Sequence, residues 1–130
     1  MQGHCLCKAI SVNVTGDLLF LYNCHCRQCR AFSGASYATN ATVLADDLTI
    51  SDPGNHLSCY QMQGGKRYFC GNCGSPVYSH PNEAETMPAL HIGLLDDPPD
   101  KAIDANLWVS EKCPWVGIDG AVENFERALE

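Results

Sequence analysis

The sequence predicts a mainly β protein made of several small twisted antiparallel sheets that are pinned by zinc, with little helix. Three observations lead to this prediction. Short strand-like segments recur between turn sequences, eleven glycines and seven prolines interrupt the chain, and nine cysteines gather in clusters. A chain of 130 residues is long enough for one hydrophobic core but not for two. We therefore expect a single zinc-binding domain over residues 1–130.

The first predicted strand contains Ile10, Val12 and Val14, which alternate with polar residues as in a strand with one buried face. Residues 18–22 are expected to form its hairpin partner, after a turn at Gly16-Asp17. Further strands are expected where short apolar runs lie between turn sequences, at residues 35–43, 48–51, 57–61, 67–69, 76–80, 89–94 and 107–110.

Helix is expected in two places only. Residues 27–32 are predicted to form a short helix that ends near Ser33-Gly34. The C-terminal tail has apolar residues at helical spacing, namely Ala121, Val122, Phe125 and Leu129. Both tryptophans, Trp108 and Trp115, are expected to pack in the core, and His91 is expected to be a core or edge residue of its strand.

The charge and the start of the chain exclude several classes of protein. A net charge of −7 argues against a nucleic-acid-binding surface. Residues 1–5 have neither the basic flank nor the apolar run of a secretory signal, and no stretch approaches the roughly 20 apolar residues of a membrane span. We expect a soluble, cytoplasmic protein without nucleic-acid or membrane partners. An odd number of cysteines in a reducing compartment favours metal binding over disulfides.

Five of the eight basic residues lie close in sequence to the cysteine clusters: Lys8, Arg27, Arg30, Lys66 and Arg67. They either only offset the negative charge of metal-bound thiolates or also attract a small anion. Under the second interpretation, Arg27 and Arg30 are the candidates for holding a substrate carboxylate, such as that of glutathione.

The segment Cys70-Gly71-Asn72-Cys73-Gly74 has the spacing of a zinc knuckle, in which two thiolates converge across a tight turn. A tetrahedral site needs two further ligands, and Cys5-Leu6-Cys7 can supply them because residues i and i+2 of an extended chain face the same side. Zinc held by Cys5, Cys7, Cys70 and Cys73 has no position left for a substrate. This site is therefore predicted to be structural.

The segment Cys24-His25-Cys26-Arg27-Gln28-Cys29-Arg30 predicts a second zinc site. If its start is extended and its end is helical, the sulfurs of Cys24, Cys26 and Cys29 can meet one ion while His25 points away. Three protein ligands leave the fourth position to water or substrate, as in catalytic zinc sites. The alternative is that Cys59, Cys113 or a histidine completes the site.

A thiolate-rich zinc site with an open position favours thiol chemistry. Such a site binds an incoming thiol and holds it as thiolate at neutral pH. A thiolate can attack a small carbonyl compound, and the reverse reaction breaks the same carbon–sulfur bond.

In this order, the cysteine segments resemble the glutathione-dependent formaldehyde-activating enzyme family, which also includes centromere protein V. The resemblance rests on the motifs at residues 3–7, 24–30, 34–35, 67–75, 93–98, 107–109 and 112–115.

The resemblance implies a β-tent fold, shared with methionine sulfoxide reductase B. It also implies that Cys5, Cys7, Cys70 and Cys73 hold a structural zinc ion, and that Cys24, Cys26 and Cys29 hold the zinc described as catalytic. The family's named activity is that of a carbon–sulfur lyase, which joins glutathione to formaldehyde and gives S-hydroxymethylglutathione.

Two residues depart from the family pattern. Lys8 stands where the family usually has glycine, and Asn106 stands where a histidine often precedes an Ile-Trp-like pair. The leading hypothesis is thus a zinc-dependent carbon–sulfur lyase or synthase that acts on a thiol adduct of a small aldehyde. The alternative is a non-catalytic zinc scaffold that binds a protein partner.

Overall fold

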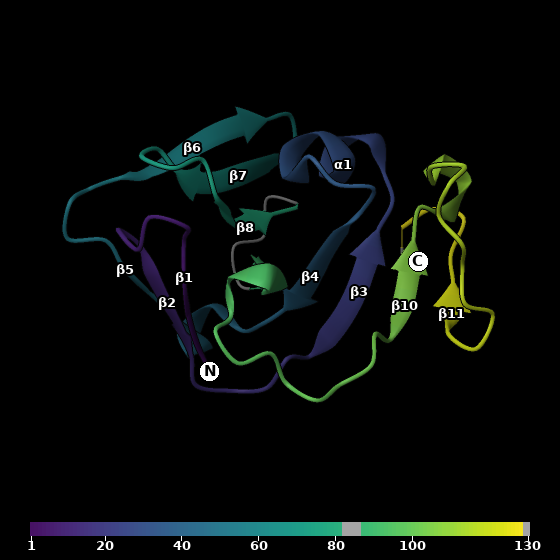
Figure 1. Cartoon of the computed structure of the whole chain (residues 1–130), viewed down its shortest axis with the longest axis horizontal. Coiled ribbons are helices and arrows are strands. Elements are labelled where there is room, and N and C mark those ends of the chain that lie inside the picture. Colours follow the sequence, from purple (N-terminus) through teal and green to yellow (C-terminus); the bar gives the residue numbers. More distant parts are fainter. Residues whose placement is uncertain (82–86, 129–130) are drawn as a thin grey trace. The chain divides into compact units, whose positions relative to one another are not determined.

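The computed structural model describes residues 1–81 and 87–128, and its elements are labelled in Figure 1. The chain divides into two compact units. The first unit comprises Met1–Leu19 and Ala41–Pro99, and the second comprises Phe20–Asn40 and Asp100–Glu130. Strands dominate both units, so the prediction of a mainly β protein with several small sheets and little helix is confirmed.

The first unit contains a three-stranded antiparallel sheet of β1 (Gln2–His4), β2 (Ser11–Val14) and β5 (Leu48–Ser51), in the order β1-β2-β5. The predicted alternation in β2 is correct, because Val12 and Val14 are buried. The predicted hairpin between β2 and residues 18–22 is wrong. Strand β2 pairs with β1 and β5, so both of its edges are already occupied.

The same unit contains an antiparallel run of strands in the order β9-β8-β7-β6. These strands are β6 (Leu57–Met62), β7 (Gly65–Cys70), β8 (Pro76–His80) and β9 (Ala89–His91), all at or near their predicted positions. The predicted turn between β6 and β7 contains Gly64, whose φ of 81° is a conformation that glycine adopts without steric cost. Strand β7 ends at Cys70, the first cysteine of the knuckle.

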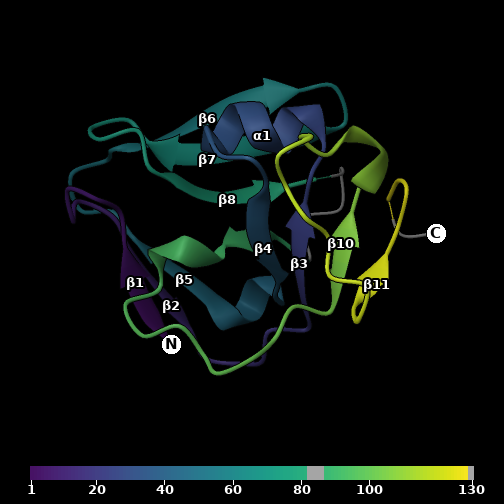
Figure 2. The ribbon, with the colours of Figure 1, turned by 45° about the vertical axis from the view of Figure 1, so that its right-hand side comes forward.

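The second unit is built around β3 (Phe20–Cys24), β10 (Ala105–Leu107) and β11 (Glu123–Asn124), together with the start of β4 (Ala38–Thr42). Strand β10 runs parallel to both β3 and β11, and Figure 2 shows it between them. The sheets are therefore not purely antiparallel as predicted. The short helix α1 (Arg27–Ser33) follows β3, where the sequence predicts it.

Three segments differ from their predicted structure. The tail forms strand β11 instead of a helix, and Leu129 of the predicted helical face lies outside the described residues. Strand β9 ends at His91, where a 3-10 turn (Ile92–Leu94) begins, and β10 ends at Leu107, before the 3-10 turn Val109–Glu111. A third 3-10 turn, Ala45–Asp47, precedes β5. Within the described residues, no helix is long and apolar enough to cross a membrane.

Candidate metal centres

The first cluster brings together the sulfur atoms of Cys5, Cys7, Cys70 and Cys73, which all lie within 4.8 Å of one another. The sulfurs of Cys5 and Cys7 are 3.7 Å apart, and those of Cys7 and Cys70 are 3.8 Å apart. A tetrahedral zinc ion with zinc–sulfur bonds of about 2.3 Å places its ligand sulfurs about 3.8 Å apart. The four thiols therefore have the donor chemistry and the spacing that zinc requires.

The backbone around the first cluster is fixed by hydrogen bonds within the first unit. In the N-terminal turn, the amide of Lys8 donates to the carbonyl of Cys5 (3.0 Å), and the amide of Ile10 donates to the Cys5 sulfur (3.3 Å). In the knuckle, the amide of Gly74 donates to the carbonyl of Cys70 (2.7 Å). The amide of Leu6 donates to the hydroxyl of Ser75 (3.0 Å), which joins the two halves of the cluster.

The same surroundings favour thiolates at two of the four sulfurs. The side-chain amide of Asn72 donates a hydrogen bond to Cys7 (3.1 Å) and lowers the pKa of that thiol. Burial raises the pKa of Cys73, but hydrogen bonds with Ser75 and Cys7 together outweigh burial and hold the pKa at about 5. Burial raises the pKa of Cys70 to about 11, so a metal ion must displace a proton from this thiol when it binds.

The second cluster lies at the junction of β3 and α1, where the sulfurs of Cys24, Cys26 and Cys29 lie within 4.8 Å of one another. Cys24 ends the strand. Cys26 is the extended N-cap residue of the helix, and its sulfur accepts the backbone N–H of Cys29 at 3.3 Å. The change from strand to helix thus brings the three sulfurs together. Among the described residues, no fourth histidine, cysteine or acidic side chain joins the group.

The three candidates for a fourth ligand of the second cluster lie outside the group of three sulfurs. The sulfur of Cys113 lies 3.6 Å from Nη1 of Arg30, and Cys59 is an exposed residue of β6 in the first unit. The buried ring of His25 has its Nε2 at 3.1 Å from Oδ1 of Asn106. The amide group of Asn106 donates to Oδ1 of Asn124 (3.0 Å), so its own Oδ1 accepts and Nε2 of His25 carries the proton.

Two thiols of the second cluster, those of Cys24 and Cys26, have pKa values shifted in opposite directions. Hydrogen bonds from Cys24 and Cys29 lower the pKa of Cys26 to about 2, and the hydrogen bond to Cys26 raises the pKa of Cys24. Because the pKa of Cys24 is raised, a binding cation must displace the proton of this thiol. Cys24 and Cys29 also pack with Ala38, Ala105 and Leu107 in a buried apolar cluster, which limits the access of water to the sulfurs.

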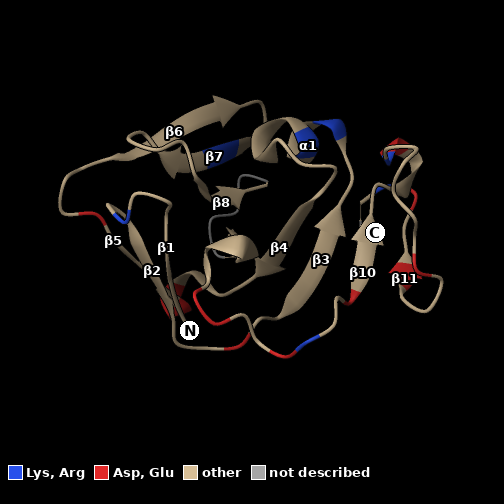
Figure 3. Cartoon of the chain, viewed as in Figure 1, with Lys and Arg blue, Asp and Glu red and all other residues tan. Residues whose placement is uncertain are grey.

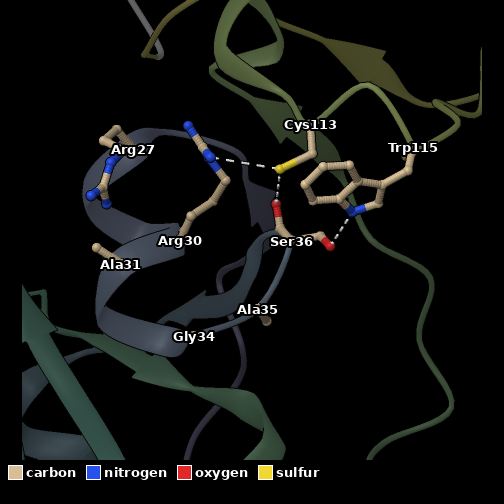
Figure 4. Close-up of a pocket in the computed structure, with 8 residues that line it drawn as sticks. All are labelled: Arg27, Arg30, Ala31, Gly34, Ala35, Ser36, Cys113 and Trp115. Atoms are coloured by element: carbon tan, nitrogen blue, oxygen red, sulfur yellow. Dashed lines mark hydrogen bonds between the residues drawn. The ribbon is translucent and has the colours of Figure 1, made fainter.

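Arg27 and Arg30 of α1 line a pocket of about 400 Å³. Figure 4 shows this pocket, and Figure 3 shows the basic residues of α1 in blue. Cys113 and Trp115 line the same pocket, whereas none of the three clustered cysteines does. The prediction that Trp115 packs in the core is wrong, because 74% of this residue is exposed. Trp108, in contrast, is half-buried and packs against the apolar cluster around Cys24.

The fold and the two cysteine clusters define a mainly β protein with two thiolate-rich candidate metal centres. Residues 1–111 match the family described as glutathione-dependent formaldehyde-activating enzyme, so the chain belongs to this family.

The chain is also similar to two individual proteins. A Schizosaccharomyces pombe protein named as an uncharacterized lyase is 24% identical over 111 residues, which cover 85% of this chain and 80% of that protein. The crystal structure of a Rhodobacter sphaeroides protein has a TM-score of 0.64 at 23% identity, and it covers 77% of this chain and 92% of that one. The second likeness concerns the fold alone.

Proposed function

We propose that the protein is a zinc-dependent carbon–sulfur lyase of the glutathione-dependent formaldehyde-activating type. It would form or cleave the thiol adduct of a small aldehyde, such as S-hydroxymethylglutathione. The observation that carries this proposal is the group of Cys24, Cys26 and Cys29, to which no other described side chain contributes a ligand. Membership of the family and the lyase name of the yeast relative support the reaction type.

In the proposed reaction, the thiol adds across the carbonyl group of the aldehyde. A carbon–sulfur bond forms, the thiol proton ends on the carbonyl oxygen, and the reverse reaction restores both reactants. Zinc, when bound, supplies a Lewis acid that favours the thiolate form of the substrate. The protein's own contribution is the set of three soft sulfur ligands, the apolar packing around Cys24 and Cys29, and the positive charge of Arg27 and Arg30 for a substrate carboxylate.

The first cluster has a different role under this proposal. Zinc bound by Cys5, Cys7, Cys70 and Cys73 has four protein ligands and so no position for a substrate. It would join the N-terminal turn to the knuckle and stabilise the first unit. The protein would therefore bind two zinc ions per chain, of which only the one at Cys24, Cys26 and Cys29 takes part in the reaction.

Exchange NMR of formaldehyde with glutathione tests the proposed function. We expect the zinc-loaded protein to accelerate exchange between free formaldehyde and its glutathione adduct, and Cys26→Ser to lose this acceleration. Cys59→Ser is the matched control, because Cys59 is an exposed cysteine outside both clusters, and it should behave as the unmodified protein does. If the unmodified protein and Cys26→Ser give the same exchange rate, formaldehyde activation is ruled out.

A further inference from the structure

Three hydrogen-bonded side chains connect the C-terminal tail with the second cysteine cluster. The ring of His25 is bonded to the side chain of Asn106 (3.1 Å), which is bonded in turn to the side chain of Asn124 (3.0 Å). His25 follows the last residue of β3, Asn106 belongs to β10 and Asn124 to β11, so these bonds cross three neighbouring strands of the second unit (Figure 2). His25 and Asn106 are buried, whereas Asn124 is exposed. We call these three side chains the polar ladder.

The tail sets the direction of every hydrogen bond in the polar ladder. The side-chain nitrogen of Asn124 donates to two backbone carbonyls, those of Asp119 (3.3 Å) and Val122 (3.0 Å), and a carbonyl can only accept. Oδ1 of Asn124 therefore faces Asn106, so Asn106 donates to it and accepts from Nε2 of His25. Without this fixed acceptor, the amide group of Asn106 can turn over and pair with the other tautomer of His25. Asn124 thus selects one of two arrangements.

His25 stands between two of the cluster's cysteines, so its conformation determines how their sulfurs approach one another. Its backbone amide donates to the carbonyl of Leu107 (3.0 Å), and its carbonyl accepts from Nε of Arg30 (3.3 Å). Among the described residues, Nδ1 of its ring has no hydrogen-bond partner. Within that part of the chain, the orientation of the ring therefore depends on the bond to Asn106 and on packing against Tyr37, whose ring centroid is 5.0 Å away.

The register of the strands separates the polar ladder from the sulfurs. Leu107 of β10 lies opposite Cys24 of β3, and both belong to the buried apolar cluster. Successive side chains of a strand point to opposite faces, so Asn106, which precedes Leu107, points to the other face. His25, the residue after Cys24, meets Asn106 there. The polar ladder can therefore affect a bound metal ion only through the backbone that carries the cysteines.

We propose that Asn106 and Asn124 are positioning residues of the second cysteine cluster, which hold His25 in one orientation and thereby fix the backbone between two of its cysteines. The consequence for catalysis rests on the proposed function, whereas the consequence for metal binding does not. Groups that orient metal ligands from outside typically account for about 10- to 100-fold in metal affinity or activity. Asn124 lies beyond residues 1–111, which match the family, so the tail contributes to a site whose cysteines all lie within that range.

Stepwise removal of zinc by a chelator tests this positioning role, because the first cluster is a reference within the same chain. The step that belongs to the second cluster is the one that Cys26→Ser lacks. We expect Asn124→Ala to weaken zinc binding at the second cluster about tenfold and to leave the first cluster within about twofold. Asn106→Leu should weaken the second cluster at least as much. Ser110→Ala removes another contact of the tail, the bond from its hydroxyl to the carbonyl of Glu126, and should affect neither cluster.

Two outcomes of this titration would overturn the proposal. One is unchanged zinc binding at the second cluster in Asn124→Ala. The other is equal weakening at both clusters, because it would assign the effect to a general loss of stability. Asn124 is exposed, so its replacement leaves the core intact and keeps the test valid even if Asn106→Leu does not fold.

Asn124→Asp distinguishes the polar ladder from a simple tether of the tail. A carboxylate still accepts from Asn106, but it cannot donate to the carbonyls of Asp119 and Val122. Backbone bonds continue to hold the tail on β10, such as that from the amide of Phe125 to the carbonyl of Asn106 (2.9 Å). We expect Asn124→Asp to keep zinc binding at the second cluster within about twofold. A loss as large as in Asn124→Ala would show that the tail is only a tether, and the proposal would fail.

Nitrogen–proton NMR of the His25 ring supplies a readout that does not depend on activity. In the zinc-loaded protein we expect a proton on Nε2 that is protected from exchange with water, and no proton on Nδ1. The protection should persist in Asn124→Asp and be lost in Asn124→Ala. A proton on Nδ1 of the unmodified protein would contradict the direction of the polar ladder and reject the positioning role.

The formaldehyde exchange assay separates this proposal from the proposed function. At saturating zinc, we expect Asn124→Ala to lower kcat about tenfold and to leave KM for glutathione within about twofold, because the polar ladder orients metal ligands and does not hold the substrate. Unchanged kcat and zinc affinity in this variant, with normal exchange by the unmodified protein, would reject the positioning role alone. Weakened zinc binding in this variant, without any acceleration of exchange by the unmodified protein, would reject the lyase and leave the positioning role in place.

Discussion

Lys8, in the turn that follows Cys7, adopts a φ of 66°, a left-handed conformation that costs a residue with a Cβ atom about 1 kcal/mol or more. This backbone conformation explains why glycine is expected at this position of the family. We expect Lys8→Gly to stabilise the zinc-loaded protein by about 0.5–1 kcal/mol in urea unfolding. Lys8→Ala removes the same charge but keeps the Cβ atom, and it should give no such gain. Equal stabilisation by both variants would assign the effect to charge instead.

His91 is buried in β9, with its Nε2 3.4 Å from the hydroxyl of Ser79. Burial, aided by the positive charge of Arg67, lowers its pKa from 6.5 to about 4. The folded protein therefore binds a proton less readily than the unfolded chain, and stability is lost as the pH falls from 6.5 towards 4.

We expect the unmodified protein to lose roughly 2 kcal/mol more stability than His91→Gln between pH 7 and pH 5. Urea unfolding of both proteins at the two pH values measures this difference, and protonation of the metal ligands cancels because it affects both proteins alike. Parallel losses would show that His91 does not titrate in this range.

Among the candidate site residues, the cysteines were the most predictable from sequence. Their spacing is short, so the local backbone alone determines which sulfurs can converge. The positions of Asn72 and Ser75 beside the sulfurs were missed, although polar residues in a tight turn often hydrogen-bond to their neighbours. The exposure of Trp115 was not predictable, because the local sequence does not show which side chains the rest of the fold will cover.

At the scale of the secondary-structure elements, helix α1 is stabilised by a capping residue at each end. Cys26 caps its first turn through sulfur, and Gly34 ends it at a φ of 69°. A Cβ atom added at Gly34 would meet no atom within 4 Å, so the cost of a substitution there is purely conformational.

We expect Gly34→Ala to lower the free energy of unfolding by about 1 kcal/mol and to weaken metal binding at the second cluster, because α1 carries Cys29. Thermal unfolding and competition with a chelator measure the two effects. Gly93→Ala is the control, since its Cβ atom also has open space and Gly93 does not require a left-handed conformation. Indistinguishable behaviour of the two variants would remove the role given to the C-cap.

The positions of most strands were predictable, whereas some of their partners were not. A period-two pattern indicates that a segment is extended and which face is buried, as at Val12 and Val14. It does not identify the neighbouring strand, so the partners of β2 were missed. In the tail, helical spacing of apolar residues was overruled by pairing of β11 with β10, where Asn124 bonds to Asn106.

At the scale of the whole molecule, each compact unit contains one cysteine cluster. Both tryptophans belong to the second unit, and Cys73 belongs to the first. The hypothesis of a single domain over residues 1–130 can therefore be tested by removing a ligand from one unit and observing the other.

We expect Cys73→Ser to reduce bound zinc by one ion per chain and to lower the melting temperature by 10 °C or more, as roughly several kcal/mol of metal-binding free energy are lost. If the chain is one domain, the melting temperature measured by tryptophan fluorescence should fall by the same amount as the melting temperature measured by circular dichroism. Cys59→Ser should change neither property. An unshifted tryptophan transition would instead show that the two units unfold independently.

The measurement that tests the central claim most directly is metal analysis combined with absorption spectroscopy of the cobalt-substituted protein. We expect two metal ions per chain, and an increase in thiolate-to-cobalt charge-transfer absorption when glutathione is added, as its thiolate joins Cys24, Cys26 and Cys29. The increase should be absent in Cys26→Ser and unchanged in Cys59→Ser. A single tightly bound metal ion per chain, or a spectrum that glutathione does not alter, would contradict the lyase and favour a non-catalytic zinc scaffold.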